Sequence, residues 1–313
     1  MFMTFLSIVI PVYNEEESIS ILCQEVWAMA KSQGYEAEIV IVDDGSTDQT
    51  FLESKKIKNA KVIRLRKNCG QSTAIEIGIR NSSGEFIALL DGDGQNDPLG
   101  IPQMLEYLLK NDFDMVVGWR FNRKDKFLKR LSSRIAWGIR HVLLSESIHD
   151  SGCTLKVMKR STANQLKVKG QLHRLLPALA SIQGFSVGEL KVNHRPRIYG
   201  KTKYRWTRGV NGIADILLIS YRKRYSQRPI HFFGGLTAIF SLVGLFLFIA
   251  QLWNLNFYGD PFKVLVFVAL SSIIFGIGII LDSIESVSEW NPEKFIIEVS
   301  HAANKTNEIS ETS

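Results

Sequence analysis

The chain has 313 residues, of which 45% are hydrophobic and 22% are charged, and its formal net charge is +7 at pH 7. This length allows one large domain with an appendage, and the three scattered cysteines exclude a disulfide framework and show no metal-type spacing. All but three of the 38 Lys and Arg residues precede Pro229. No nucleic-acid-binding module is recognised, so we expect this basic surface to face phosphorylated substrates and anionic lipids and to bind no nucleic acid.

Short apolar, β-branched runs with helical stretches between them recur through the first 120 residues. They predict strands at Leu6–Val12, Glu38–Val42, Lys61–Leu65, Phe86–Leu90 and Met115–Val117. The apolar residues stand on consecutive positions, which is typical of strands covered on both faces in a parallel α/β sheet. Because such sheets bind ligands at the carboxyl ends of their strands, we expect functional residues in the loops that follow.

Polar loops follow the first four predicted strands. They are Tyr13-Asn14-Glu15, Asp43-Asp44-Gly45-Ser46, Asn68-Cys69-Gly70 and Asp91-Gly92-Asp93-Gly94-Gln95. The first loop has no G-x-G-x-x-G pattern, which argues against a dinucleotide-binding site, and a phosphate-binding P-loop is absent as well. The chemistry must therefore come from the carboxylates and amides of these loops.

The loop that begins at Asp91 carries the strongest chemical signal. Asp91 and Asp93 alternate with glycines, which makes an oxygen-rich site for Mg²⁺ or Mn²⁺ with room for phosphate oxygens. A divalent cation at this loop would neutralise the charge of a departing diphosphate. A calcium loop of the EF-hand type is the competing interpretation, but Pro102 stands where its bidentate Glu is expected.

Basic amphipathic segments follow this region. Lys126–Leu144 has apolar residues at helical spacing with Lys and Arg among them, and this pattern fits both a helix in the membrane interface and a helix packed on the sheet. Gly209–Tyr221 is a second amphipathic candidate that leads into an apolar region.

Two long apolar blocks, Phe232–Leu255 and Phe262–Leu281, reach the length of roughly 20 residues that crosses a bilayer. The alternative is a buried helical hairpin of a soluble protein. Basic residues stand just before the first block, and the turn between the blocks has no Lys or Arg, so the large domain is expected on the cytoplasmic side of the inner membrane. We divide the chain into a catalytic domain at 1–205, a juxtamembrane amphipathic segment at 206–229, a two-helix transmembrane anchor at 230–284 and a cytoplasmic polar tail at 285–313.

Four motifs together resemble family 2 inverting glycosyltransferases, in the branch that makes dolichol- or undecaprenyl-phosphate sugars. They are PVYNEEE (Pro11–Glu17), VDDGSTDQT (Val42–Thr50), NCGQSTA (Asn68–Ala74) and DGDGQNDP (Asp91–Pro98). The resemblance extends from Leu6 to about Lys203, and the two-helix anchor is similar to that of bacterial members. It implies an α/β catalytic domain of the GT-A type, Rossmann-like with a mostly parallel sheet, followed by an amphipathic interface region and two transmembrane helices.

The resemblance also implies roles for individual residues. The nucleotide-sugar would be bound by Pro11, Tyr13, Asn14, Glu15, Asp43, Asp44, Gly70, Asp91, His173, Arg197 and Lys203. The catalytic residues would be Asp91, Asp93 and Asp150, and the metal ligands Asp93 and Gln95. The lipid phosphate would be bound by Arg120, Ser133 and Arg134. A phosphate acceptor is already an anion and needs no strong base, so Asp150 can equally position substrate, and His173 can equally be a structural histidine.

The implied reaction moves a single sugar from a nucleotide-sugar to undecaprenyl or another polyprenyl phosphate with inversion. The product would serve cell-envelope glycan or lipid A modification. A UDP-sugar is the preferred donor and GDP-mannose the alternative, membrane lipids are expected partners, and a homo-oligomer is compatible with the resemblance. Processive synthases of the superfamily carry Q-x-x-R-W, but Thr202 replaces the Gln before Arg205-Trp206. The rival hypotheses are transfer to another lipid or saccharide acceptor and a non-catalytic membrane scaffold.

Overall fold

The computed structural model describes residues 5–120, 138, 148–168, 170, 172–196, 216–221 and 296–301, with isolated positions at 266, 269, 272, 273, 276, 279 and 280. The chain forms two compact units, of which the first comprises Met1–Leu217 with Pro292–Ser313 and the second Leu218–Asn291. The candidate site lies in the first unit.

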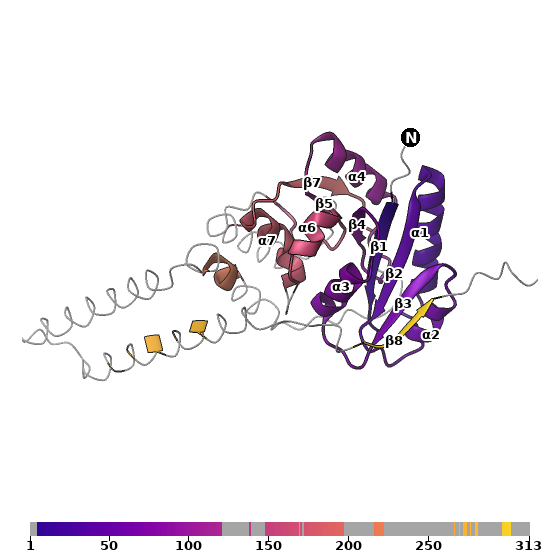
Figure 1. Ribbon diagram of the computed structural model, residues 1–313, viewed down its shortest axis with the longest axis horizontal. Coiled ribbons are helices and arrows are strands. Elements are labelled where there is room, and N and C mark those ends of the chain that lie inside the picture. The colour runs from indigo at the N-terminus through magenta and orange to yellow at the C-terminus, as the bar shows by residue number, and fades with distance from the viewer. Residues whose placement is uncertain are drawn as a thin grey trace, which may run out of the picture. The chain divides into compact units, whose positions relative to one another are not determined.

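The first unit is built on an eight-stranded sheet with the order β7-β5-β6-β4-β1-β2-β3-β8 among the described residues (Figure 1). The strands are β1 Phe5–Val12, β2 Glu36–Asp43, β3 Ala60–Leu65, β4 Phe86–Leu89, β5 Met115–Arg120, β6 Lys156–Lys159, β7 Val187–Val192 and β8 Ile296–His301. Only β6 and β8 run antiparallel to their neighbours, so the predicted mostly parallel α/β sheet is confirmed.

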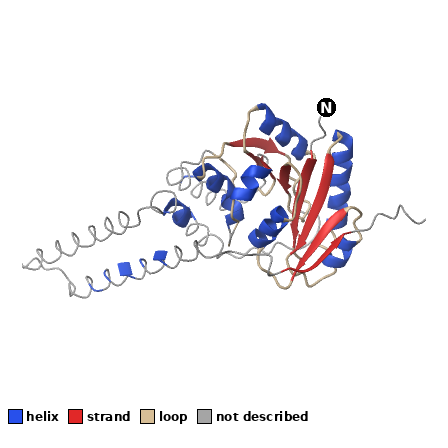
Figure 2. Cartoon of the chain, viewed as in Figure 1, coloured by secondary structure: helices blue, strands red, loops and turns tan. Residues whose placement is uncertain are grey.

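Helices lie on both sides of the strands (Figure 2). They are α1 Ile19–Gln33, α2 Thr50–Lys55, α3 Gln71–Arg80, α4 Gly100–Lys110, α6 Arg160–Gln165, the 3₁₀ helix η1 Leu172–Leu175 and α7 Leu176–Ile182. The central strands are buried on consecutive positions, as Ile8, Val9 and Ile10 of β1 illustrate. This double coverage explains why their sequences are continuously apolar and do not alternate.

The strand β8 is a feature that the sequence analysis missed, because it placed residues 285–313 in a polar tail. β8 pairs antiparallel with β3, with Glu298 opposite Arg64 and Ile296 opposite Leu65. Ile296 packs against the core, and Lys55 Nζ lies 2.9 Å from Glu298 Oε1. A short edge strand that mixes apolar and charged residues carries a weak sequence signal, and this strand has no long hydrophobic run.

The predicted membrane spans fall outside the described part of the chain, except for seven isolated helical positions between Val266 and Ile280. Within the described residues, no helix has the length and apolar character needed to cross a bilayer. The predicted basic helix at Lys126–Leu144 also lies outside the described residues, apart from position 138.

Candidate active site

The loop after β1 is fastened to the loop after β2. Asn14 donates its backbone N–H to Ser46 Oγ at 2.9 Å, and its Oδ1 accepts the N–H of Thr47 at 2.9 Å. The backbone N–H of Glu15 donates to Thr50 Oγ1 at 2.8 Å. Asn14 has a φ of 53°, a left-handed conformation that Asn tolerates. The side chain of Asn14, expected to bind the donor, is thus engaged in joining two loops.

Asp44 joins the loop after β2 to the loop after β3. Its two carboxylate oxygens accept the backbone N–H groups of Cys69 at 2.7 Å and Gly70 at 2.9 Å. Burial raises the pKa of Asp44 to about 6, although these hydrogen bonds favour its charged form. The structure therefore gives Asp44 a role in shaping the loop that ends in Gly70, the residue before α3.

Gln71 and Ser18 attach the acidic loop to its neighbours. Gln71 Nε2 donates to Asp91 Oδ1 at 2.6 Å, and Ser18 Oγ donates to the carbonyl oxygen of Gly92 at 2.7 Å. Gly92 has no room for a side chain, since a Cβ there would lie 2.6 Å from Val12 Cγ1. Sequence reasoning missed both donors, although Gln71 lies inside a recognised motif that could have indicated it.

His173 is brought to the same edge of the sheet from η1. Its Nδ1 lies 2.8 Å from Ser72 Oγ, and its backbone N–H donates to the same hydroxyl at 3.2 Å. Ser72 follows Gln71, whose side chain binds Asp91, in the first turn of α3. The two bonds to Ser72 therefore place His173 near Asp91, but neither of them contacts the acidic loop.

Asp43 is buried with unused hydrogen-bonding capacity. Its Oδ1 accepts the N–H of Ser46 at 3.0 Å, whereas its buried Oδ2 has no hydrogen-bond partner. Arg64 Nε forms an ion pair with Oδ2 at 3.5 Å but no hydrogen bond to it. Burial raises the pKa of Asp43. A buried carboxylate oxygen of this kind is suited to accept an N–H group of a ligand.

The acidic loop is held at its far end by Asp97, leaving Asp91 and Asp93 at the near end. Asp97 accepts hydrogen bonds from the backbone of Leu99 at 3.1 Å and from Arg195 Nη2 at 2.9 Å. The N–H of Arg195 also donates to the carbonyl oxygen of Gln95 at 2.8 Å. The loop thus has a fixed backbone on which a ligand set can be arranged.

Asp91 and Asp93 fit a divalent cation that is shared with a ligand. Burial, followed by the negative charge of Asp93, raises the pKa of Asp91 to about 6, and a cation would relieve this repulsion. Within the described residues, no three His, Cys, Asp or Glu side chains gather as a complete metal site. Mg²⁺ and Mn²⁺ sites of phosphate-processing enzymes need few protein ligands, because substrate phosphates and water supply the others.

Beside Asp91 lies a group of charged residues that are buried or half-buried. Lys156, the first residue of β6, is 2% exposed and donates from Nζ to the carbonyl oxygen of Cys153; burial lowers its pKa, while nearby charges including Asp91 oppose this shift. Arg120 donates from Nε to Asp150 Oδ2 at 2.7 Å and from Nη2 to Asp150 Oδ1 at 2.8 Å. Arg120 and Asp150, predicted in separate roles, thus form one bidentate pair.

The remaining predicted residues divide into two groups. Pro11 and Tyr13 lie at the end of β1 and in the loop after it, as expected for a site at the carboxyl edge of the sheet. Ser133, Arg134, Arg197 and Lys203 lie outside the described residues.

Two known proteins are similar to most of this chain. The chain is 38% identical over 254 residues to the dodecaprenyl-phosphate galacturonate synthase of Rhizobium johnstonii, covering 77% of this chain and 75% of the relative. It is 30% identical over 285 residues to the undecaprenyl-phosphate 4-deoxy-4-formamido-L-arabinose transferase of Pectobacterium carotovorum, covering 88% of this chain and 86% of the relative.

The fold also has solved counterparts. Glucosyl-3-phosphoglycerate synthase from Mycobacterium tuberculosis, crystallised with Mn²⁺, UDP and glucosyl-3-phosphoglycerate, is similar with a TM-score of 0.57 and 16% identity, over 70% of this chain and 80% of that chain. This likeness supports a GT-A-like α/β sheet. The family model described as glycosyl transferase family 2 matches residues 7–167. By its motifs, its relatives and this match, the chain is a glycosyltransferase that belongs to glycosyl transferase family 2.

Proposed function

We propose that this enzyme transfers one sugar from a nucleotide-sugar to undecaprenyl phosphate or another polyprenyl phosphate, with inversion of the anomeric carbon. The relatives that are 38% and 30% identical are both named for sugar transfer involving a polyprenyl phosphate, and they match over most of their length. The observation that carries the proposal in this chain is the pair Asp91 and Asp93, held at the carboxyl edge beside the Arg120–Asp150 pair.

Asp43 favours a uridine diphosphate sugar as donor. Uracil offers one ring N–H group, whereas guanine presents two adjacent N–H donors that need two acceptor oxygens. Asp43 Oδ1 already accepts the N–H of Ser46, so Oδ2, which has no hydrogen-bond partner, is the oxygen most open to a base. Arg64 beside it can donate to a uracil carbonyl oxygen. One open acceptor oxygen beside an arginine donor matches uracil better than guanine, which supports a UDP-sugar over GDP-mannose.

Asp93 and Gln95, with Asp91 beside them, would hold Mg²⁺ or Mn²⁺ together with the donor diphosphate. The cation would supply charge neutralisation for the leaving nucleoside diphosphate. Asp91, oriented by the amide of Gln71, accepts a hydrogen bond from the donor in this proposal. Tyr13, Glu15, His173, Arg197 and Lys203 complete the proposed donor contacts, and Asn14, Asp44 and Gly70 shape the loops around them.

The reaction is a direct displacement. An oxygen of the acceptor phosphate attacks the anomeric carbon from the face opposite the diphosphate, a new carbon–oxygen bond forms, and the bond to the nucleoside diphosphate breaks. The acceptor is an anion at neutral pH and therefore needs no strong base. Both carboxylate oxygens of Asp150 accept hydrogen bonds from Arg120, which suits a positioning role for Asp150 and a phosphate-binding role for Arg120 with Ser133 and Arg134.

The strand topology supports an even number of membrane crossings between β7 and β8. The chain leaves the sheet after β7 and re-enters it at Ile296 opposite Leu65, and both points lie at the carboxyl edge. Because β8 returns to the same sheet, any membrane crossings between them must be even in number. We propose two crossings by Phe232–Leu255 and Phe262–Leu281, which keep the catalytic domain at 1–205, the segment 206–229 and the tail at 285–313 on the cytoplasmic side of the inner membrane.

A transfer assay tests the proposed function. The purified full chain in detergent is incubated with undecaprenyl phosphate, Mn²⁺ and a panel of UDP- and GDP-sugars, and the lipid products are analysed by mass spectrometry. We expect a lipid heavier by one sugar, equimolar release of UDP, and loss of both on chelation of the cation. Transfer to diacylglycerol alone, or UDP release without any lipid product, would contradict the proposed acceptor.

A further inference from the structure

We infer that Glu189 is a positioning residue for the acceptor phosphate, acting through the His149–Asp150 turn to hold the Arg120 guanidinium in place. This inference rests on the proposed function, because it takes Arg120 as a phosphate-binding group. Glu189 lies on β7, opposite Val117 of the parallel neighbour β5. It was not among the residues that the sequence analysis singled out.

The first link joins Glu189 to the turn. Glu189 Oε1 accepts the backbone N–H of Asp150 at 2.8 Å, and Oε2 accepts the backbone N–H of His149 at 3.1 Å. Oε2 also lies 2.7 Å from His149 Nδ1. The Glu189 side chain is 11% exposed. A single, largely buried carboxylate therefore fixes two successive peptide groups, which determines the direction in which the Asp150 side chain leaves the backbone.

The second link joins Asp150 to Arg120. Besides the bidentate contact at 2.7 and 2.8 Å, Asp150 Oδ2 accepts the backbone N–H of Arg120 at 3.3 Å. The two side chains are 14% and 17% exposed. These bonds occupy Nε and Nη2 of the guanidinium, and Nη1 is not engaged by Asp150. An Arg fixed in this way loses little further freedom when it binds a phosphate oxygen.

The turn is also braced on its other side. The His149 ring stacks on Trp119, with centroids 4.5 Å apart and an interplanar angle of 11°. Lys191 Nζ lies 5.3 Å from the centre of the Trp119 ring. The strands β5 and β7 are already paired over their whole length, so the sheet itself does not depend on Glu189. Within the described part of the chain, no hydrogen bond joins Glu189 directly to Arg120, and its influence must pass through the turn.

The substitution Glu189→Gln tests the first link with almost no change in size. It places an amide NH₂ against one of two backbone N–H donors, so one of them loses its acceptor. We expect the KM for undecaprenyl phosphate to rise roughly tenfold, while kcat and the KM for the donor change less than about threefold. Glu106→Gln, an exposed carboxylate on α4, is the matched control and should match the wild type.

A second comparison separates the backbone contact from the imidazole contact. His149→Ala keeps both peptide N–H groups bound to Glu189 and removes only the ring, so its acceptor KM should rise less than that of Glu189→Gln. Glu189→Asp keeps the charge but is one methylene too short to reach both amides. The thermal midpoint and the UDP affinity of Glu189→Gln show whether that variant folds. If it does not, Glu189→Asp replaces it, and the same rise in the acceptor KM is expected.

A double-mutant cycle decides whether the effect passes through Arg120. In the Arg120→Ala background, Glu189→Gln should raise the acceptor KM no further, because the group that it positions is gone. Independent, multiplicative effects, or an equal rise in donor and acceptor KM, would overturn the inference. The assay of the wild type distinguishes failure of the proposed function from failure of the inference about Glu189. Without a wild-type polyprenyl product the proposed function fails, whereas a product made equally well by Glu189→Gln removes only the inference.

Discussion

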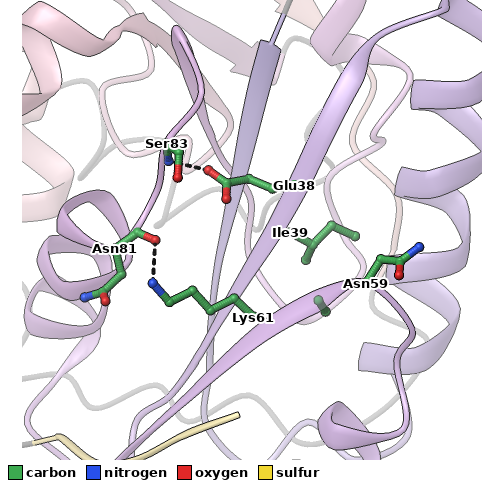
Figure 3. A pocket seen from close by; sticks show the side chains of 7 residues that line it. Glu38, Ile39, Asn59, Lys61, Asn81 and Ser83 are labelled. Carbon is green, nitrogen blue, oxygen red and sulfur yellow. Dashed lines mark hydrogen bonds between the residues drawn. The ribbon is translucent and has the colours of Figure 1, made fainter. Parts of the chain in front are cut away.

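The two ends of the parallel strands hold similar polar residues that are used differently. At the amino end, a cavity of about 240 Å³ is lined by Glu38, Lys61, Asn81 and Ser83 among others (Figure 3). Glu38 Oε1 accepts hydrogen bonds from Ser7 Oγ at 2.6 Å and from the backbone of Ser83, and Lys61 Nζ donates to the carbonyl oxygen of Asn81 at 3.1 Å. These charged groups are satisfied by the protein itself.

At the carboxyl end, some charged groups retain capacity for a ligand. Asp43 Oδ2 is buried without a hydrogen-bond partner, and Asp91 is disfavoured as an anion by burial and by Asp93. Other carboxylates at this end, such as Asp44, are fully engaged in joining loops. A polar cluster therefore indicates a ligand site when its members are left unsatisfied, and its presence in a cavity is weaker evidence.

The largest loss of activity is expected from a substitution at Asp93, at the carboxyl end. Asp93→Ala should lower kcat/KM by roughly three orders of magnitude, because charge on the leaving diphosphate is no longer neutralised. The thermal midpoint should change little, because among the described residues the Asp93 carboxylate accepts a hydrogen bond only from the nearby N–H of Gln95, at 3.1 Å. Steady-state kinetics with the full chain and a thermal melt measure both. Near-normal turnover would remove Asp93 from the site.

Asp44 lies at the carboxyl end of the strands, but both of its carboxylate oxygens already accept backbone hydrogen bonds. Its pKa in the folded chain is about 6, above its ordinary value of 3.8, so the unfolded chain releases the proton first. Stability should therefore fall as pH rises from about 4 to about 6, by at most roughly 3 kcal/mol. Asp44→Asn, which does not titrate, should flatten this part of the stability profile in denaturant unfolding. An equal pH dependence of the free energy of unfolding in the wild type and in Asp44→Asn would contradict the raised pKa of Asp44.

A substitution at Asp43 tests whether this residue binds the base of the nucleotide-sugar. Asp43→Asn should lower kcat/KM for a UDP-sugar roughly 10- to 100-fold, because the amide replaces one of the two acceptor oxygens by an NH₂ donor, so that either Ser46 or uracil loses its acceptor. The loss should appear in the donor KM and in UDP affinity measured by calorimetry. An unchanged UDP affinity would place the base elsewhere.

Glu38 gives the smallest expected effect on catalysis. Glu38→Gln leaves one donor at the amino end without its acceptor, so the free energy of unfolding should fall by about 1 kcal/mol. Its kcat/KM should stay within about twofold of the wild type. A large catalytic loss with intact stability would mean that the cavity at the amino end has a function of its own.

The sequence predicted the features that depend on local pattern. Continuous apolar runs indicated β1 and β2, and the Asp91–Asp93 alternation indicated the acidic loop. Glu189 could not be found in this way, because its role arises from contacts with a turn 39 and 40 positions away in the chain, such as the 2.8 Å bond from the backbone N–H of Asp150. Gln71 lies inside a recognised motif, but only the fold shows its 2.6 Å bond to Asp91. Asn14 and Asp44 lie in the predicted loops, but only the fold shows that their side chains bind neighbouring loops.

Binding of Mn²⁺ tests the central claim most directly, because it asks whether Asp91 and Asp93 capture a cation together with a nucleoside diphosphate. Titration of the full chain with Mn²⁺, followed by electron paramagnetic resonance with and without UDP, should show one tight site per chain that requires UDP. Asp93→Ala should lose this site and Glu38→Gln should keep it. Undiminished UDP-dependent Mn²⁺ binding by Asp93→Ala would contradict the account.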